Sequence, residues 1–457
     1  MTTSKFTAGE SISFCDETTC PQMGCVPTVC QGKGVPSNEQ LFTRSAQVIP
    51  GGVNSSIRAF RSVGGQPYLV SRAQGAHVWD VEGTRLIDLV QSYGAIILGH
   101  AHPTVTAAVA AAVVDGTSYG APTPREMKLA EAISARVQSC EQVRFMNSGT
   151  EATSTAVRLA RGTTGRKRIV TFHGNFHGAT DALLAAGGSG IATLGLPGTA
   201  GVPDEAVANT WVMPYNVVPQ LDHDVAAVIV EPVGANMGVV APQKGFLEGL
   251  RKECDRVGAL LIFDEVITGF RLGLGGAQAK FDVHPDLTCF GKVIGGGLPI
   301  GAVGGRRDVM ENLTPLGTVF HAGTLAGNPL ATAAGLAALS ELNDDVYMEL
   351  SARARRLSAV LRDACSSNGI EAQFPVVGTL VGMHFGNTLQ GNSPRNFDDA
   401  KTTDEKMYAQ IFHALLSNGV ALPPGAYEAL FVGLAHTDEI IDQIGEIAHT
   451  ALAGVRR

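Results

Sequence analysis

Apolar runs of strand length recur through the middle of the chain and alternate with helical patterns. The runs lie at residues 142–146, 168–172, 226–232, 259–263 and 287–290. Helical patterns lie at residues 38–46, 103–114, 125–137 and 245–257, in the segment after Ser148, and in GNFHGATDALLAA. Buried strands that alternate with helices predict an α/β fold with a mostly parallel sheet and helices on both of its faces.

The two ends of the chain predict a second, smaller unit. AHVWDVEGTRLIDL alternates apolar and polar residues around Glu82 and Gly83, as a hairpin does. Helices resume near Gly335, and residues 368–457 mix the strand-like GTLVGMHF and ALFVGLA with helices. We therefore expect an arm (1–37), an N-terminal segment (38–100), a large domain (101–340) and a small C-terminal α+β domain (341–457).

Composition narrows the class of protein. A chain of 457 residues exceeds what one core normally supports, and 45% hydrophobic with 17% charged residues is ordinary for a globular protein. A net charge of -8 argues against a nucleic-acid partner. No run of about 18 apolar residues and no basic leader is present, so we expect a cytoplasmic protein without a membrane partner.

Four of the eight cysteines recur every five residues near the N-terminus, at Cys15, Cys20, Cys25 and Cys30. This spacing matches neither paired zinc knuckles nor the common iron–sulfur runs. We interpret residues 1–37 as a flexible extension with exposed thiols and predict no metal site.

Two predicted strands end in groups that can react. The run at 259–263 is followed by Asp264, and the run at 287–290 by Gly291 and Lys292. Parallel neighbours would bring both side chains to the carboxyl edge of the sheet, where α/β proteins bind ligands. Taken singly, the lysine would be a solvated loop residue and the aspartate a turn former. Together they suit pyridoxal phosphate (PLP), which needs an amine for its aldehyde and a carboxylate beside its ring nitrogen.

Further side chains could hold the same cofactor. The strand at 142–146 leads into a turn at Ser148-Gly149 and a helix that opens at Thr150-Glu151, with Thr150 as the expected cap. Free N–H groups at such a helix start bind anions, so the turn is a candidate phosphate site. Phe176 could stack on the cofactor ring or could be an ordinary core aromatic. His173 and His177 lack the glutamate of a zinc motif.

The phrases FDEVITGFR and GKVIGGGLPIGAVGG resemble the class III, fold type I aminotransferases, which depend on PLP. Within that class PGGVNSSIRAF, GSGIATLGLPGTAGVP, EPVGANMG and PPGAYEALFVG are similar to the glutamate-1-semialdehyde 2,1-aminomutase family, from about Leu41 to the C-terminus. The resemblance implies a large domain with a smaller one built from both ends of the chain. It also implies a homodimer with active sites at the interface.

The resemblance also implies an activity and assigns roles to residues. It predicts that PLP, through its pyridoxamine form, shifts an amino group within glutamate-1-semialdehyde to give 5-aminolevulinate, while Lys292 moves the protons. The implied cofactor contacts are Ser148, Gly149, Thr150, Phe176, His177, Asn236, Asp264, Val266 and Lys292, with Gly323 and Thr324 from the neighbouring subunit. The implied substrate contacts are Ser55, Arg58, Tyr93, Ser189 in a gating loop, and Glu428.

Three positions depart from the family pattern: Tyr93 in SYGA instead of SWGP, Phe176 in NFHGA instead of CYHGH, and His321 in FHAGT instead of YQAGT. All three match positions near the cofactor or substrate in that family. An alternative prediction is therefore a paralogous class III aminotransferase or mutase that acts on another amino or keto acid in specialised metabolism. A second alternative is a non-catalytic binding module with the cysteine arm as a sensor, against which the presence of Lys292 and Asp264 argues.

Overall fold

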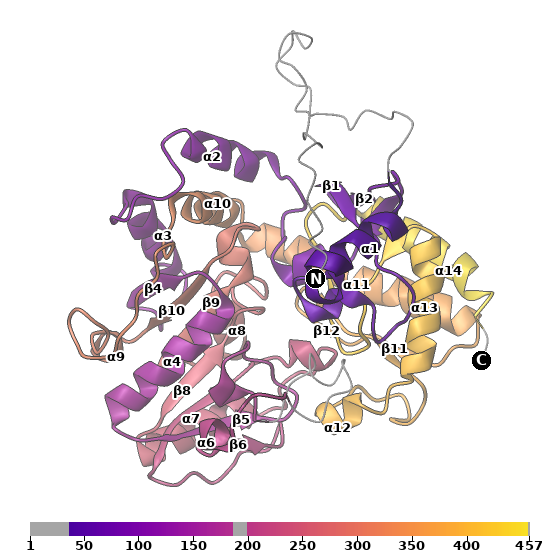
Figure 1. Cartoon of the computed structure of the whole chain (residues 1–457). Helices are drawn as coiled ribbons and strands as arrows, with labels where there is room; N and C mark the ends of the chain where they lie inside the picture. The colour runs from indigo at the N-terminus through magenta and orange to yellow at the C-terminus, as the bar shows by residue number, and fades with distance from the viewer. Residues whose placement is uncertain (1–35, 186–198, 456–457) are drawn as a thin grey trace, which may run out of the picture.

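The computed structural model describes residues 36–185 and 199–455. The cysteine-bearing arm and the predicted gating loop around Ser189 therefore lie outside the described residues. Figure 1 shows a large lobe built on a central sheet and a second lobe in which the beginning and the end of the chain lie together. Among the described helices, none has the length and apolar character needed to cross a membrane.

The central sheet has seven strands in the order β4-β10-β9-β8-β7-β5-β6. Only β10 runs against the others, so the predicted mostly parallel sheet is confirmed. The strands span β4 Gln142–Met146, β5 Arg168–Phe172, β6 Thr210–Met213, β7 Val225–Val230, β8 Leu260–Asp264, β9 Leu287–Gly291 and β10 Gly301–Gly305.

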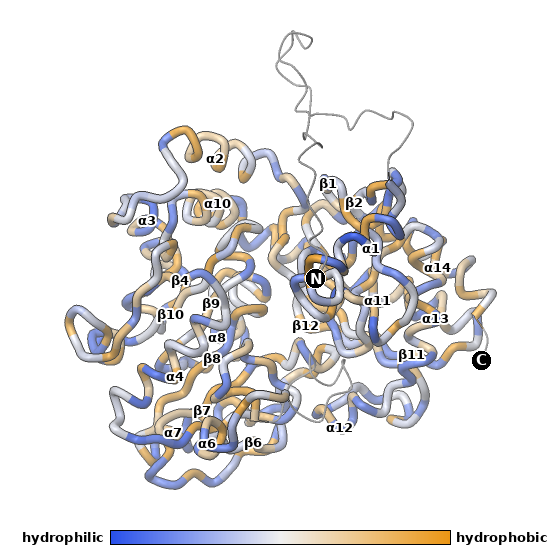
Figure 2. The backbone as a smooth tube through the Cα atoms, viewed as in Figure 1, coloured by the Kyte–Doolittle hydropathy of each residue, from blue (hydrophilic) through white to orange (hydrophobic). Residues whose placement is uncertain are grey.

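Alternate residues of the central strands enter two different cores, one on each face of the sheet. Val228 of β7 and Phe263 of β8 pack with Leu250 of α7 (Phe246–Val257). Ile229 and Ile262 point the other way and pack with α4 (Gly149–Thr164). Both faces are thus covered by helices, which explains why these strands read as continuous apolar runs in the sequence and appear orange in Figure 2.

The second lobe joins the two ends of the chain in one sheet. Strands β1 (Val70–Gln74), β2 (His77–Asp80) and β3 (Arg85–Asp88) form a meander, and β15 (Val420–Ala421) pairs in parallel with β3. The predicted hairpin is confirmed as β2–β3, whereas β1 was not predicted. Smaller sheets contain β11 Ala372–Gln373, β12 Val376–Val377, β13 Leu380–Val381, β14 His384–Phe385 and β16 Leu430–Phe431.

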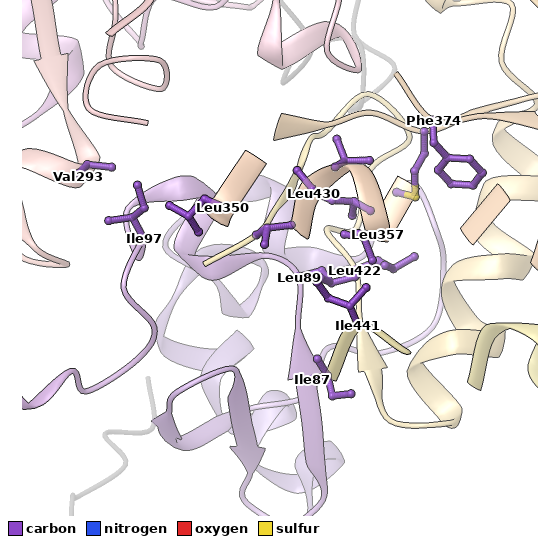
Figure 3. Packing of buried hydrophobic residues seen from close by; sticks show 14 of the residues in the cluster. Ile87, Leu89, Ile97, Val293, Leu350, Leu357, Phe374, Leu422, Leu430 and Ile441 are labelled. Carbon is purple, nitrogen blue, oxygen red and sulfur yellow. The ribbon is translucent and has the colours of Figure 1, made fainter. Parts of the chain in front are cut away.

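Helix α11 (Asp344–Ser367) packs against α14 (Asp438–Leu452) and carries the core of this lobe. Figure 3 shows Leu357 of α11 near Leu430 and Leu422, and Leu350 of the same helix beside Ile97, toward Val293 at the boundary of the large lobe. The remaining helices are α1 Asn38–Val48, α2 Pro103–Val113, α3 Pro124–Ser134, α6 Asp204–Val207, α8 Gly276–Phe281, α9 Arg307–Met310, α10 Pro329–Ser340, α12 Phe397–Ala400 and α13 Glu405–Ser417.

Two local predictions were wrong. The cap of α4 is Ser148, not Thr150, because Ser148 has extended backbone angles and its side chain accepts the N–H of Glu151. The Glu151 carboxylate turns back to the N–H of Asn147, so no reciprocal capping box closes the turn. GNFHGATDALLAA is not helical in its described part, where only the 3₁₀ turn Asp181–Leu183 forms. Its two glycines take positive φ, which a helix cannot accommodate.

Replacement of Gly301 in β10 by alanine should disturb the start of α4. A Cβ there would lie 2.1 Å from the backbone oxygen of Ser148, so the strand or the turn must shift. We expect the free energy of unfolding to fall by about 1–3 kcal/mol, measured by urea denaturation. Gly454→Ala is the control, since its Cβ would approach nothing closer than 3.9 Å. Equal stability of the two variants would contradict this packing.

Candidate active site

A cavity of about 540 Å³ opens at the carboxyl edge of the central sheet. Strands β8 and β9 run in parallel, with Asp264 opposite Cys289, so Asp264 ends one strand and Lys292 directly follows the other. Both side chains line this cavity. Lys292 has a φ of 48°, a left-handed angle that turns the chain sharply at the end of β9. The amine and the carboxylate predicted to act together therefore share one cavity.

Asp264 is buried and firmly held. Its Oδ2 lies 2.7 Å from Nδ1 of His177, and its Oδ1 accepts the N–H of Val266 at 3.1 Å. The other ring nitrogen of His177 lies 3.0 Å from the hydroxyl of Thr171 on β5. Because both imidazole nitrogens are engaged, the ring has one orientation and fixes the carboxylate in turn. His177 thus acts on the cavity through Asp264 as well as lining it.

The start of helix α4 faces the same cavity through Ser148, Gly149 and Thr150. The N–H groups at the start of a helix have no acceptor within the helix and carry partial positive charge. A Cβ on Gly149 would lie 2.9 Å from Val266, so glycine keeps this end of the cavity open. The hydroxyl of Thr150 accepts the N–H of Ala179, which closes the turn beside it. The arrangement suits a bound anion such as a phosphate.

Glu231, directly after β7, was not predicted as a site residue. It binds both Phe176 and Asn236, which were predicted to contact the cofactor. Its Oε1 accepts the N–H of Phe176 at 2.6 Å, and its Oε2 accepts Nδ2 of Asn236 at 3.0 Å. Phe176 is 39% exposed, which excludes the core aromatic considered as its alternative. Asn175 beside it has a buried Nδ2 without a partner among the described residues. The sequence did offer a signal for Glu231, which stands before Pro232 at the end of an apolar strand. An acid that is buried at such a position is almost always paired with another group.

Burial shifts the titration of three groups that line the cavity. It lowers the pKa of Lys292 to about 8, against the opposing charges of Glu428, Glu231 and Asp264. It raises the pKa of Glu231 to about 7, with a further contribution from the Asp264 charge. It also raises the pKa of Glu428 to about 7, partly offset by Lys292. A lysine amine that loses its proton this readily can act as a nucleophile and as a base near neutral pH.

Ser55, Tyr93 and Glu428, which come from segments outside the central sheet, also line the cavity. Burial and the Glu428 charge raise the pKa of Tyr93, while the charge of Arg58 opposes this rise. Tyr93 therefore lies within the fields of an acid and a guanidinium. Arg58 itself is exposed in the 3₁₀ turn Ser56–Ala59 and does not line the cavity, although Ser55 next to that turn does.

Gly323 and Thr324 lie outside the cavity of their own chain and are exposed. Gly323 and His321 line a different surface hollow, and Gly323 lies close to the side chain of Asn147. Large apolar side chains flank the segment, with Leu316 73% and Phe320 67% exposed. The structure thus brings together Ser55, Tyr93, Ser148, Gly149, Thr150, Phe176, His177, Asn236, Asp264, Val266, Lys292 and Glu428, but not Arg58, Gly323 or Thr324. Ser189 is outside the described residues.

The raised pKa of Glu428 predicts a pH-dependent gain in stability for Glu428→Gln. Between about pH 4.5 and 7 the folded protein holds this proton more tightly than the unfolded chain, so wild-type stability falls as pH rises through that window. Glutamine lacks this loss, and the variant should gain up to about 3 kcal/mol relative to wild type over the window. Urea denaturation at pH 5 and 8 measures it, with the exposed Glu446→Gln as control. A gain that is the same at both pH values would be inconsistent with a buried carboxyl.

Comparison with known proteins identifies the family of the chain. The model of the family Aminotransferase class-III matches residues 60–452. A glutamate-1-semialdehyde 2,1-aminomutase of Bordetella avium is 48% identical, over 91% of this chain and 98% of the relative. Another, of Aquifex aeolicus, is also 48% identical, over 89% of this chain and 97% of the relative.

Solved structures include transaminases and an aminomutase. An omega-transaminase from Sphaerobacter thermophilus gives a TM-score of 0.81 at 30% identity, covering 91% of this chain and 97% of that one. A glutamate-1-semialdehyde aminomutase from Pseudomonas aeruginosa PAO1 in complex with PMP gives 0.79 at 26%, covering 91% and 94%. These neighbours confirm the predicted fold, and the chain belongs to the class III aminotransferase family.

Proposed function

We propose that this protein is a PLP-dependent aminomutase that converts glutamate-1-semialdehyde to 5-aminolevulinate. The observation that carries the proposal is the meeting of Lys292 and Asp264 in one cavity, in a chain 48% identical to aminomutases over nine-tenths of its length. The proposal favours catalysis over a binding module. The cytoplasmic location predicted from the sequence stays a prediction.

The residues of the cavity fit the cofactor at both ends. The N–H groups at the start of α4 and the space kept by Gly149 suit its phosphate. Asp264, fixed by His177, suits a protonated ring nitrogen at the other end. Phe176 presents an exposed face to the cavity, and Asn236 offers an amide to a ring oxygen.

When bound, PLP supplies an aldehyde that exchanges amino groups and a ring that accepts electrons. The protein supplies the rest. Lys292 lines the cavity and would hold the aldehyde, and its amine, with a pKa of about 8, could take up and return a proton near neutral pH. Asp264 would keep the ring nitrogen charged, and Glu231 holds the backbone of Phe176 and the side chain of Asn236, which would flank the ring. Arg58 lies just outside the cavity lining, in the turn next to Ser55, and its side chain would have to turn inward to bind the substrate carboxylate as a guanidinium can.

A rival activity within the class has specific support. Tyr93, Phe176 and His321 depart from the aminomutase pattern, and the similar solved structures include an omega-transaminase. The rival is a transaminase or another mutase that acts on a different amino or keto acid. The two differ in their need for a second amine, because a mutase returns the amino group to the same carbon skeleton.

We also propose that two copies of this chain form a homodimer with shared active sites. Gly323 and Thr324 lie outside their own cavity but beside exposed apolar side chains, Leu316, Phe320 and Leu325. Exposed apolar patches of this kind mark contact surfaces. In the dimer this segment supplies a second contact to the phosphate of the neighbouring subunit.

Incubation of the loaded enzyme with glutamate-1-semialdehyde and no amino donor tests the proposed function. We expect many turnovers to 5-aminolevulinate, measured by product assay, and a loss of at least about 10³-fold in Lys292→Ala. Lys280→Ala is the control, since this lysine lies in α8 and does not line the cavity. A single turnover that restarts only with added amine would identify the rival, and full activity of Lys292→Ala would remove the catalytic assignment.

Mixing two inactive variants tests the shared site. Lys292→Ala damages the cavity of its own chain, whereas Thr324→Asp should repel the phosphate bound by the partner. A mixed dimer then has one site with both defects and one site with none. After unfolding and refolding together, the mixture should recover roughly a quarter of wild-type activity, since random pairing makes half of the dimers mixed. No recovery would place Thr324 in the site of its own chain, and a Thr324→Asp variant that is fully active by itself would place Thr324 outside the site.

A further inference from the structure

The turn that carries Tyr93 has an unusual backbone. Gln91, Ser92, Tyr93 and Gly94 all have positive φ, at 44°, 52°, 55° and 94°. Three successive non-glycine residues in this region of backbone angles are strained. Such a turn persists only where surrounding contacts impose it. Because Tyr93 faces the cavity from this turn, those contacts decide where its side chain lies.

Arg271 makes the most concentrated of these contacts. Its side chain is fully buried, and its Nε and Nη2 donate to the carbonyl of Gly94 at 3.1 and 3.0 Å. Nη2 also donates to Ile96 O at 3.2 Å, and Nη1 donates to Val432 O at 3.1 Å. Four hydrogen bonds from one planar group thus join the turn to the segment after β16.

The binding mode of Arg271 differs from that of an ordinary buried ion pair. Within the described ranges no carboxylate forms an ion pair with it, and its guanidinium lies 5.2 Å from the ring centre of Phe431. Burial lowers the pKa of Arg271 to about 10, which records the cost of placing a charge here. The guanidinium of Arg271 supplies hydrogen-bond donors to the carbonyl oxygens of the strained turn.

Arg271 also connects two segments that carry cavity-lining residues, the loop after Asp264 and the turn with Tyr93. It lies seven residues after Asp264 on the same loop, and Thr379 anchors that loop by donating to the carbonyl of Arg271 at 3.0 Å. Phe431, against which the guanidinium packs, lines the cavity together with Tyr93. The position of Tyr93 therefore depends on the loop that follows Asp264, the acid expected to pair with the cofactor.

We propose that Arg271 is a positioning residue that fixes the Tyr93 turn and thereby sets how tightly the substrate end of the cavity binds its ligand. The inference rests on the proposed function for its kinetic part only. Tyr93 lies within the fields of Glu428 and Arg58, so a shift of its ring alters the place where a substrate carboxylate would lie. A lysine at position 271 would keep the charge but lose the planar fork that reaches three carbonyls.

The turn has other supports, so Arg271→Lys should fold. Asp88 accepts the N–H groups of Val90 and Gln91 at 2.9 and 3.1 Å, independently of Arg271. The amides of Tyr93, Ala95 and Ile96 donate to carbonyls within the turn itself. Their hydrogen exchange therefore reports how firmly the turn is held.

Hydrogen exchange of the loaded enzyme tests the hold on the turn. In Arg271→Lys we expect the peptide covering residues 89–98 to exchange about tenfold faster than in wild type. Arg166→Lys is a matched control, because Arg166 also donates to three carbonyls, those of Val225, Val257 and Gly258, where β7 begins and α7 ends. Unchanged exchange at residues 89–98 in Arg271→Lys would overturn the proposal, as would an equal rise in Arg166→Lys.

A double-mutant cycle tests the path through Tyr93. Arg271→Lys should raise KM for the substrate about tenfold with a smaller change in kcat and in cofactor affinity, the latter followed by absorbance. In a Tyr93→Ala background the same substitution should add little, because its effect passes through the missing ring. Additive effects would show that Arg271 acts without Tyr93 and would overturn the proposal. A wild-type enzyme that makes no 5-aminolevulinate would refute the proposed function, while the exchange rates would still decide the role of Arg271.

Discussion

The burial of a carboxylate at the end of β8 is the constraint on which the site depends. Asp264 loses water, and its two oxygens regain partners from His177 and from the N–H of Val266. An unpaired charge here would cost several kcal/mol, so the partners and the charge must be present together. A cationic ring nitrogen brought by a cofactor would complete this set. The site is thus built around a charge that the bound cofactor balances.

The same lack of water shapes the other titrating groups. It lowers the pKa of Lys292 while it raises those of Glu231 and Glu428, so an amine and two acids come within about one unit of neutrality. Near pH 7 small changes in charge can therefore redistribute protons among them. A reaction that moves protons between neighbouring carbons needs a group that both accepts and returns a proton. A pKa near the working pH makes both transfers possible without a large free-energy cost.

Sequence patterns predicted what lies along one strand or one turn. The apolar runs ending at Asp264 and Lys292 located the site, since parallel strands bring their carboxyl ends together. They could not predict contacts between distant segments, such as His177 with Asp264 across 87 positions or Arg271 with Gly94 across 177. The cap of α4 was misassigned for a local reason, because serine and threonine can both cap a helix and the backbone angles decide between Ser148 and Thr150.

The departures from the aminomutase pattern are unequal in physical weight. The backbone N–H of Phe176 donates to Glu231, a contact that does not depend on its side chain, so the loss of a hydroxyl leaves the ring in the cavity lining. His321 lies outside the cavity of its own chain. Tyr93 differs from both, because it places a phenol where the Glu428 and Arg58 charges act and does so from a strained turn. A change in substrate preference would therefore arise at Tyr93 rather than around the cofactor.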